Sequence, residues 1–200
     1  MAIQGISIFV CALNILYMLR FPYLWPFALF NGLEVMFLTF SLLHTPKQIS
    51  HNVLAWIASA LIAIYPTLTP YLIHARTLPL WRESVSETLQ LMALAWEMWA
   101  IFVLRGSFTQ LPEAHRLVTK GPYRWMRHPL YAAYVVGFFG VAFAVMQPLF
   151  WGAFFLFVAL EIIRALAEER VLNAQFLEYK TFAQQTGRFL PKSKKGVDFS

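Results

Sequence analysis

The stretch GPYRWMRHPLYAAY, residues 121–134, decides the fold, because a basic polar segment passes here directly into a long apolar run. Proline is tolerated at the first position of a helix, where its missing N–H would have no partner. We therefore expect a helix to begin at Pro129, with His128 near its N-cap. Unpaired amides at this terminus, beside Arg124, Arg127 and His128, predict a site for an anion such as a carboxylate or a phosphate.

The composition predicts an integral membrane protein. Of the 200 residues, 59% are hydrophobic and 13% are charged, which is more apolar than a soluble domain of this size. We expect an all-α, polytopic fold with five to six transmembrane helices, the last two forming a helical hairpin around Met146-Gln147-Pro148. A helix needs about 20 apolar residues to cross a bilayer, and six stretches approach this length: residues 3–19, 22–43, 52–74, 85–104, 130–146 and 149–164.

The positive charge is unevenly placed. Five of the 16 Lys and Arg residues lie between the fourth and fifth apolar stretches, and seven lie from Arg164 onward. By the positive-inside rule both segments, including the C-terminus, are cytoplasmic, and a hairpin between them would bring them together. The alternative is that this charge only orients the protein and contacts anionic headgroups.

The sixth stretch continues into a polar helix, LEIIRALAEERVL. Spacings of three and four place Glu161, Arg164 and Glu168 on one face. One interpretation is an intrahelical Arg164–Glu168 pair. In the other, Arg164 faces a bound anion while the glutamates face a cation.

Two other acidic residues and the single cysteine give weaker indications of a functional site. Glu34 and Glu97 fall within apolar spans, where a structural role is favoured. Cys11 is the only cysteine, so the chain can form neither an intramolecular disulfide nor a Cys-based metal site. We expect no metal.

Four sequence blocks carry a resemblance to a known family: HRLVTKGPYRWMRHPLYA, IRALAEERVL, FLEY and TGRFLP. The ordered set Arg127-His128-Pro129, Tyr131 and then Glu168-Glu169 resembles the isoprenylcysteine carboxyl methyltransferase family, including its small prokaryotic members. The wider group also includes phospholipid N-methyltransferases. The resemblance covers roughly residues 110–192. It implies an S-adenosylmethionine-dependent enzyme that methylates a lipophilic acceptor from the bilayer.

The resemblance also implies site residues. Arg164, Arg127 and Glu168 are expected to be catalytic, with Arg164 on the substrate side. His128 and Tyr131 would hold the amino-acid end of the cofactor, and Glu168 and Glu169 its polar groups. Further residues would line the cofactor pocket: His115, Leu117, Val118, Gly121 and Tyr123.

We expect one domain over residues 1–200, with membrane helices in 1–104 and the cofactor-binding loop, hairpin and C-terminal helix in 105–200. The expected partners are the lipophilic substrate and membrane lipids, without nucleic acid. Arg164 favours a carboxylate acceptor slightly over an amine. Two alternatives of other classes are an oxidoreductase that resembles sterol reductases and uses a reduced nicotinamide dinucleotide, and a membrane scaffold without enzymatic activity.

Overall fold

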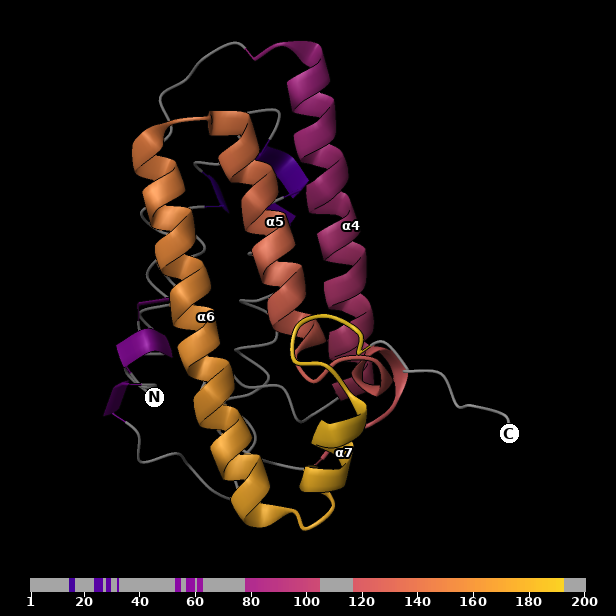
Figure 1. Ribbon diagram of the computed structural model, residues 1–200. Coiled ribbons are helices and arrows are strands. Elements are labelled where there is room, and N and C mark those ends of the chain that lie inside the picture. Colours follow the sequence, from indigo (N-terminus) through magenta and orange to yellow (C-terminus); the bar gives the residue numbers. More distant parts are fainter. Residues whose placement is uncertain are drawn as a thin grey trace, which may run out of the picture.

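The computed structural model describes residues 78–104 and 117–192 continuously, with isolated positions between residues 15 and 62. This described part consists of α4 (Leu80–Leu104), the 3-10 helix η3 (Gly121–Arg124), α5 (Pro129–Val145), α6 (Pro148–Gln175) and α7 (Tyr179–Gln185), as Figure 1 shows. Its only extended pairing is a bridge between Met126 and Gly187. Outside the described residues lie Glu34, Cys11 and most of the three predicted spans at 3–19, 22–43 and 52–74.

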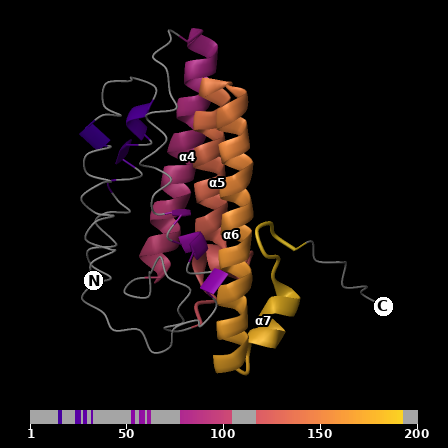
Figure 2. The ribbon, with the colours of Figure 1, turned by 90° about the vertical axis from the view of Figure 1, so that its left-hand side faces the viewer.

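Helices α4 and α5 pack side by side and antiparallel, as Figures 1 and 2 show. Near the beginning of α4, the Ser86 hydroxyl donates a 2.8 Å hydrogen bond to the Gly140 carbonyl. Farther along, the Trp96 indole N–H donates to the Pro129 carbonyl at 3.1 Å. A Cβ at Gly140 would lie 3.1 Å from the Ser86 carbonyl oxygen, so the missing side chain lets the two helices approach closely.

Helices α5 and α6 are joined by Met146 and Gln147, and Met146 adopts a left-handed conformation with φ 50°. Aromatic rings fill the space between the two helices. Phe138 of α5 contacts three rings of α6, with centroid distances of 5.6 Å to Phe150, 6.4 Å to Phe154 and 5.0 Å to Phe157. These stacked contacts hold the upper, apolar half of α6 in place beside α5.

Two of the described helices, α4 and α6, are long and apolar enough to cross a membrane. Helix α5 is apolar but shorter, with 17 residues, about 26 Å at a rise of 1.5 Å per residue. Large apolar side chains point away from the protein on both α4 and α6, among them Phe102 (71% exposed) and Phe155 (64% exposed). Such exposure suits contact with lipid.

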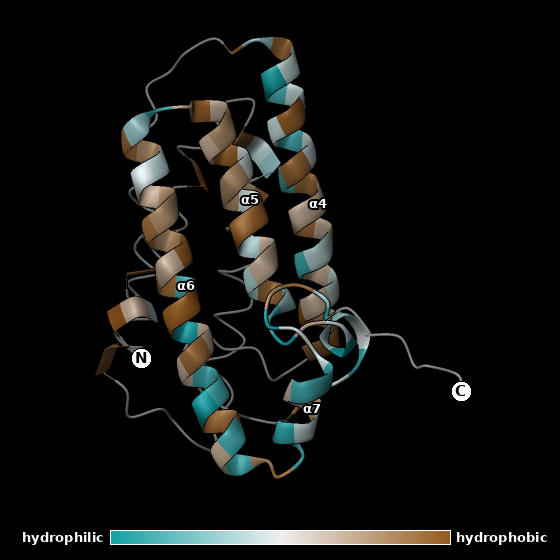
Figure 3. Ribbon diagram, in the orientation of Figure 1, coloured by the Kyte–Doolittle hydropathy of each residue, from teal (hydrophilic) through white to brown (hydrophobic). Residues whose placement is uncertain are grey.

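The bounds of α4 differ from the sequence prediction at one end. Helix α4 begins at Leu80 instead of residue 85, with Glu83 in its first turn, where a negative charge is favourable. Helix α6 continues past the apolar stretch that ends at residue 164, as predicted from the polar sequence LEIIRALAEERVL, and reaches Gln175. Figure 3 shows that the lower end of α6 is hydrophilic, as is α7 beside it. The helix therefore extends beyond its apolar part.

Candidate active site

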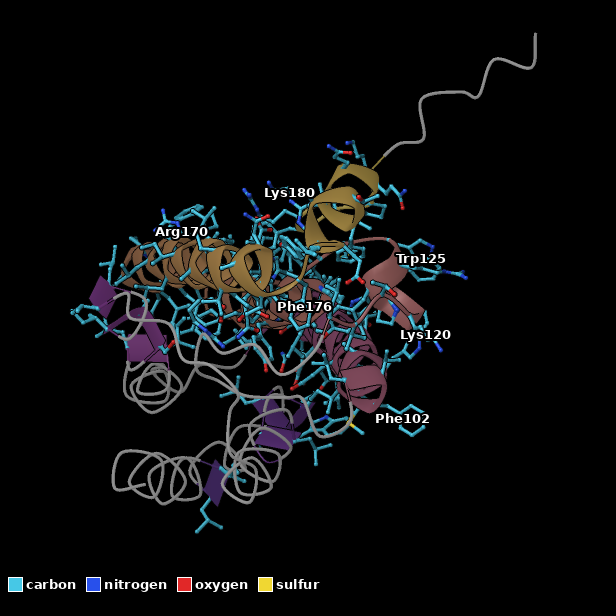
Figure 4. The ribbon with its side chains drawn as sticks, turned by 90° about the horizontal axis from the view of Figure 1, so that it is seen from below. Phe102, Lys120, Trp125, Arg170, Phe176 and Lys180 are labelled. Atoms are coloured by element: carbon cyan, nitrogen blue, oxygen red, sulfur yellow. The ribbon has the colours of Figure 1, made fainter. Side chains whose placement is uncertain are left out.

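Several predicted site residues lie together where α5 begins and α6 becomes polar. Helices η3 and α7 lie at the same end (Figures 1 and 4). The chain reaches this place through a turn at Gly121, which has φ +58°. A Cβ at Gly121 would lie 2.7 Å from Cγ2 of Val103 at the end of α4. Glycine is therefore required both for the backbone conformation and for the close approach.

The 3-10 helix that follows buries the Tyr123 side chain. Burial, together with the negative charge of Glu168, raises the pKa of Tyr123 well above its ordinary value. The phenol therefore stays protonated. Tyr123, a predicted pocket residue from the loop, thus interacts electrostatically with Glu168 of α6.

Helix α5 begins at Pro129 with His128 as its N-cap residue, as predicted. The His128 side chain makes no capping hydrogen bond. Instead, its 4% exposed ring turns toward α6, with Nε2 3.2 Å from Glu169 Oε1 and Nδ1 3.8 Å from Glu168 Oε2. The ring also stacks on Tyr131, with centroids 5.1 Å apart.

Glu168 is held by a single direct hydrogen bond among the described residues. The Tyr131 hydroxyl donates to Glu168 Oε2 at 2.8 Å, and no described residue donates to Oε1. The Glu168 side chain remains 28% exposed. One carboxylate oxygen is therefore left for a ligand.

Glu169 stands in a different environment from its neighbour. Two guanidinium groups donate to it: Arg127 Nε at 2.9 Å, and Arg188 through Nε at 3.0 Å and Nη2 at 2.8 Å. Arg127 Nη1 also donates to the carbonyls of Ala183 at 2.8 Å and Thr186 at 2.6 Å. Arg127, a predicted catalytic residue, is thus bound to acceptors of the protein itself.

Arg164 is buried, at 2% exposure. Its Nη1 donates to Glu161 Oε2 at 3.3 Å and Oε1 at 3.4 Å, and its guanidinium lies 4.6 Å from the centre of the Tyr131 ring. The structure thus pairs Arg164 with Glu161, and not with Glu168 as the intrahelical interpretation supposed. Among the described residues Nε of Arg164 has no hydrogen-bond partner.

The remaining predicted residues divide into three sets. Val118 is half-buried against the hydrophobic core, Leu117 is half-buried beside it, and His115 lies outside the described residues. Arg124 is separated from Arg127, because its guanidinium lies 4.4 Å from the Trp125 ring centre on an exposed side chain. The basic cluster at the helix start is therefore divided, with Arg124 facing outward.

Three tryptophans gather around this outer position, and we call them the tryptophan cluster: Trp96, Trp99 and Trp125. Their ring centroids lie 5.4 to 6.2 Å apart. Figure 4 shows Trp125 at the rim of this end, on the same side as Lys120. Tryptophan is enriched where a membrane meets water.

Two residues of the site, Arg188 and Tyr179, were not predicted from the sequence. Arg188 was counted only as a tail charge, although its hydrogen bonds to Glu169 raise its pKa above the ordinary value. The buried Tyr179 of α7 was not considered, and burial together with Glu169 raises its pKa. The TGRFLP block in the resemblance contained Arg188 and was the one signal that pointed to it.

Residues 80–178 match the model of the family described as "Phospholipid methyltransferase", whose members depend on S-adenosylmethionine. The match supports a membrane methyltransferase of this wider group. It includes Arg127, Tyr131, Arg164 and the Glu168-Glu169 pair, and it ends before Arg188.

A curated relative is the nickel-cobalt-cadmium resistance protein NccN of Alcaligenes xylosoxydans xylosoxydans. It is 30% identical over an alignment of 116 residues, and the match covers 50% of this chain and 46% of the relative. The chain thus spans about half the length of the curated relative that it matches.

Proposed function

We propose that this protein transfers a methyl group from S-adenosylmethionine to a lipophilic acceptor at the membrane surface. The observation that carries the proposal is the group formed by Tyr131, His128 and Glu168, which lies within the family match. Its three side chains come from two helices and meet at the end where α6 changes from apolar to polar (Figure 3).

The residues present fit the charges of this cofactor. Glu168 has an unbonded carboxylate oxygen, as far as the described residues go, which suits the cofactor's ammonium group. The buried Nε of Arg164 suits an anionic group, because a buried N–H without a partner is costly. The cofactor itself supplies the methyl group on a sulfonium, and the protein must position it and exclude water.

A carboxylate of the isoprenylcysteine type is one candidate acceptor. A carboxylate has an ordinary pKa of about 4 and is already ionised near neutrality, so it needs no general base. It needs an orienting cation, and Arg164 supplies one beside the Tyr131 ring. Because Arg164 pairs with Glu161, the two side chains together carry no net charge, which weakens the preference for a carboxylate acceptor.

The amine of a phospholipid is the second candidate, and the family match supports it equally. An amine must lose a proton before it can attack the methyl group. Glu168 is the group available to accept it, because it is the more exposed carboxylate of the Glu168-Glu169 pair.

We also propose that the site and the C-terminus face the cytoplasm and that α5 and α6 cross the membrane as a hairpin. Exposed basic side chains support this orientation. Figure 4 shows Lys120, Arg170 and Lys180 at the rim of the end that carries the site. By the positive-inside rule this is the cytoplasmic end.

Calorimetry with S-adenosylhomocysteine tests the cofactor. The purified protein should bind it, whereas binding of a nicotinamide dinucleotide alone would favour the reductase alternative, and binding of neither would favour the scaffold. His128→Ala should weaken binding, with the exposed Arg170→Gln as a matched control.

Radiolabelled S-adenosylmethionine and a lipid extract test the acceptor. A methyl ester releases volatile labelled methanol on treatment with base, whereas an N-methyl group resists it. Base-labile label would support the carboxylate, and base-stable label recovered in a phospholipid would support the amine.

A further inference from the structure

The neighbours Glu168 and Glu169 differ in the number of hydrogen bonds that their carboxylates accept. A carboxylate offers about four lone-pair positions. Glu169 receives four donors, from Arg127, His128 and twice from Arg188. Glu168 receives one, from Tyr131. Three of the donors to Glu169 share Oε1 and one binds Oε2, so Glu169 has little capacity left for a ligand, whereas Oε1 of Glu168 receives no donor from the described residues.

The donors around Glu169 join segments that are distant in the sequence. The Arg127 N–H donates to the Gly187 carbonyl at 2.9 Å, and the His128 N–H donates to the Arg188 carbonyl at 3.0 Å. The Phe189 ring lies 5.7 Å from the His128 ring. Glu169 thus lies at the centre of a junction that fixes the segment after α7 against the residues before α5.

The same junction sets the orientation of the His128 ring. A carboxylate that pairs with two guanidinium groups is ionised and can only accept hydrogen bonds. Nε2 of His128 must therefore carry the hydrogen in its contact with Glu169 Oε1. Nδ1 is left on the side of Glu168, at 3.8 Å from Oε2, which is beyond hydrogen-bond distance.

We infer that Glu169 and Arg188 are positioning residues, which hold His128 and the segment at residues 186–190 in place, and that Glu168 alone of the pair contacts the cofactor. This inference rests on the proposed function for the part that concerns Glu168. It departs from the resemblance, which assigned both glutamates to the cofactor.

Hydrogen exchange and calorimetry on the full-length protein in detergent test the inference. Glu169→Gln and Arg188→Gln should accelerate amide exchange of Arg127 and His128 at least tenfold in the cofactor-free protein. Glu168→Gln should leave this exchange unchanged and lower the affinity for S-adenosylhomocysteine at least tenfold. Arg170→Gln, next in sequence to Glu169, is the matched control and should change neither quantity.

Nitrogen-15 NMR of labelled histidine supplies a readout that a merely structural role would not move. The wild-type protein should show protonated Nε2 at His128, identified by the resonance that His128→Gln removes. Glu169→Gln should shift this protonation pattern, because a glutamine side chain can also donate. If Glu169→Gln does not fold, Arg188→Lys retains the charge without the two-point contact and should still accelerate the exchange.

Loss of cofactor affinity in Glu169→Gln with unchanged exchange would overturn the inference, because it would mean direct contact between Glu169 and the cofactor. If the wild-type protein binds no S-adenosylhomocysteine, the proposed function fails and so does the role of Glu168. The exchange and NMR results would still decide whether Glu169 and Arg188 position His128.

Discussion

Tyr131 contacts Glu168 and Arg164 through different parts of one side chain. Its hydroxyl donates to Glu168 Oε2 at 2.8 Å, and its ring lies 4.6 Å from the Arg164 guanidinium. Tyr131 is 6% exposed, so both interactions are shielded from water and strengthened by the low local dielectric. Tyr131 thus couples Glu168, which we propose for the cofactor, to Arg164, which we propose for the acceptor.

Tyr131→Phe separates these two contacts, because it removes the hydroxyl and keeps the ring. The dissociation constant for S-adenosylhomocysteine should rise about twofold to thirteenfold, as expected for a hydrogen bond of about 0.5–1.5 kcal/mol. Calorimetry measures this. Tyr131→Leu also removes the ring and should reduce turnover further. Equal turnover in the two variants would show that the ring contact with Arg164 is unimportant.

Arg164→Ala should lower turnover roughly a hundredfold, which corresponds to about 2.7 kcal/mol of transition-state stabilisation. Affinity for the cofactor should change little, and initial rates together with calorimetry measure both quantities. Because removal of Arg164 takes a cation away from the buried Glu161 and can destabilise the protein, the double variant Glu161→Gln with Arg164→Met is the control for folding. Loss of cofactor binding in the folded variants would place Arg164 on the cofactor side.

Gly121→Ala should destabilise the protein by about 1–3 kcal/mol, the usual cost of a non-glycine residue in an unfavourable backbone conformation. The left-handed φ of +58° and the 2.7 Å approach to Val103 both contribute. Thermal unfolding in detergent measures the loss. Val103→Ala in the same chain relieves the contact without changing φ. Full recovery in that double variant would show that the contact, and not the backbone, sets the requirement.

Gly187→Ala should open the junction around Glu169. A Cβ at this position would clash with the Leu190 carbonyl oxygen, so the backbone at residues 187–190 must move. The amides of Arg127 and His128 should then exchange faster, and cofactor affinity should fall. Gly152→Ala is the matched control, because a Cβ there meets nothing within 4 Å. If both variants behave alike, the turn at Gly187 does not hold the junction.

The start of α5 could be predicted from the sequence because it depends on local chemistry. Pro129 is confirmed as the first residue of the helix and His128 as its N-cap residue. The polar continuation of α6 was also predicted, because the spacing of Glu161, Arg164 and Glu168 is helical, although hydropathy alone reports only where a helix leaves the apolar phase. The helix runs on to Gln175.

The partners of the charged residues could not be predicted, because they depend on contacts between distant segments. Arg188 belongs to a stretch that resembles a solvated basic tail, yet it pairs with Glu169, 19 residues earlier. Spacing along the helix allowed Arg164 to meet either Glu161 or Glu168. Tyr131, which belongs to another helix, holds Glu168, and Arg164 pairs with Glu161.

The tryptophan cluster has a consequence for how the proposed lipophilic acceptor is placed in the membrane. Trp96 is hydrogen-bonded to the carbonyl of Pro129, which starts the helical turn that carries Tyr131, so the aromatic residues and the site lie at similar depth. Because tryptophan side chains favour the headgroup level, an acceptor can present its reactive end to the site while its tail stays among the acyl chains. The protein then avoids the cost of lifting that tail into water, about 0.8 kcal/mol for each methylene group.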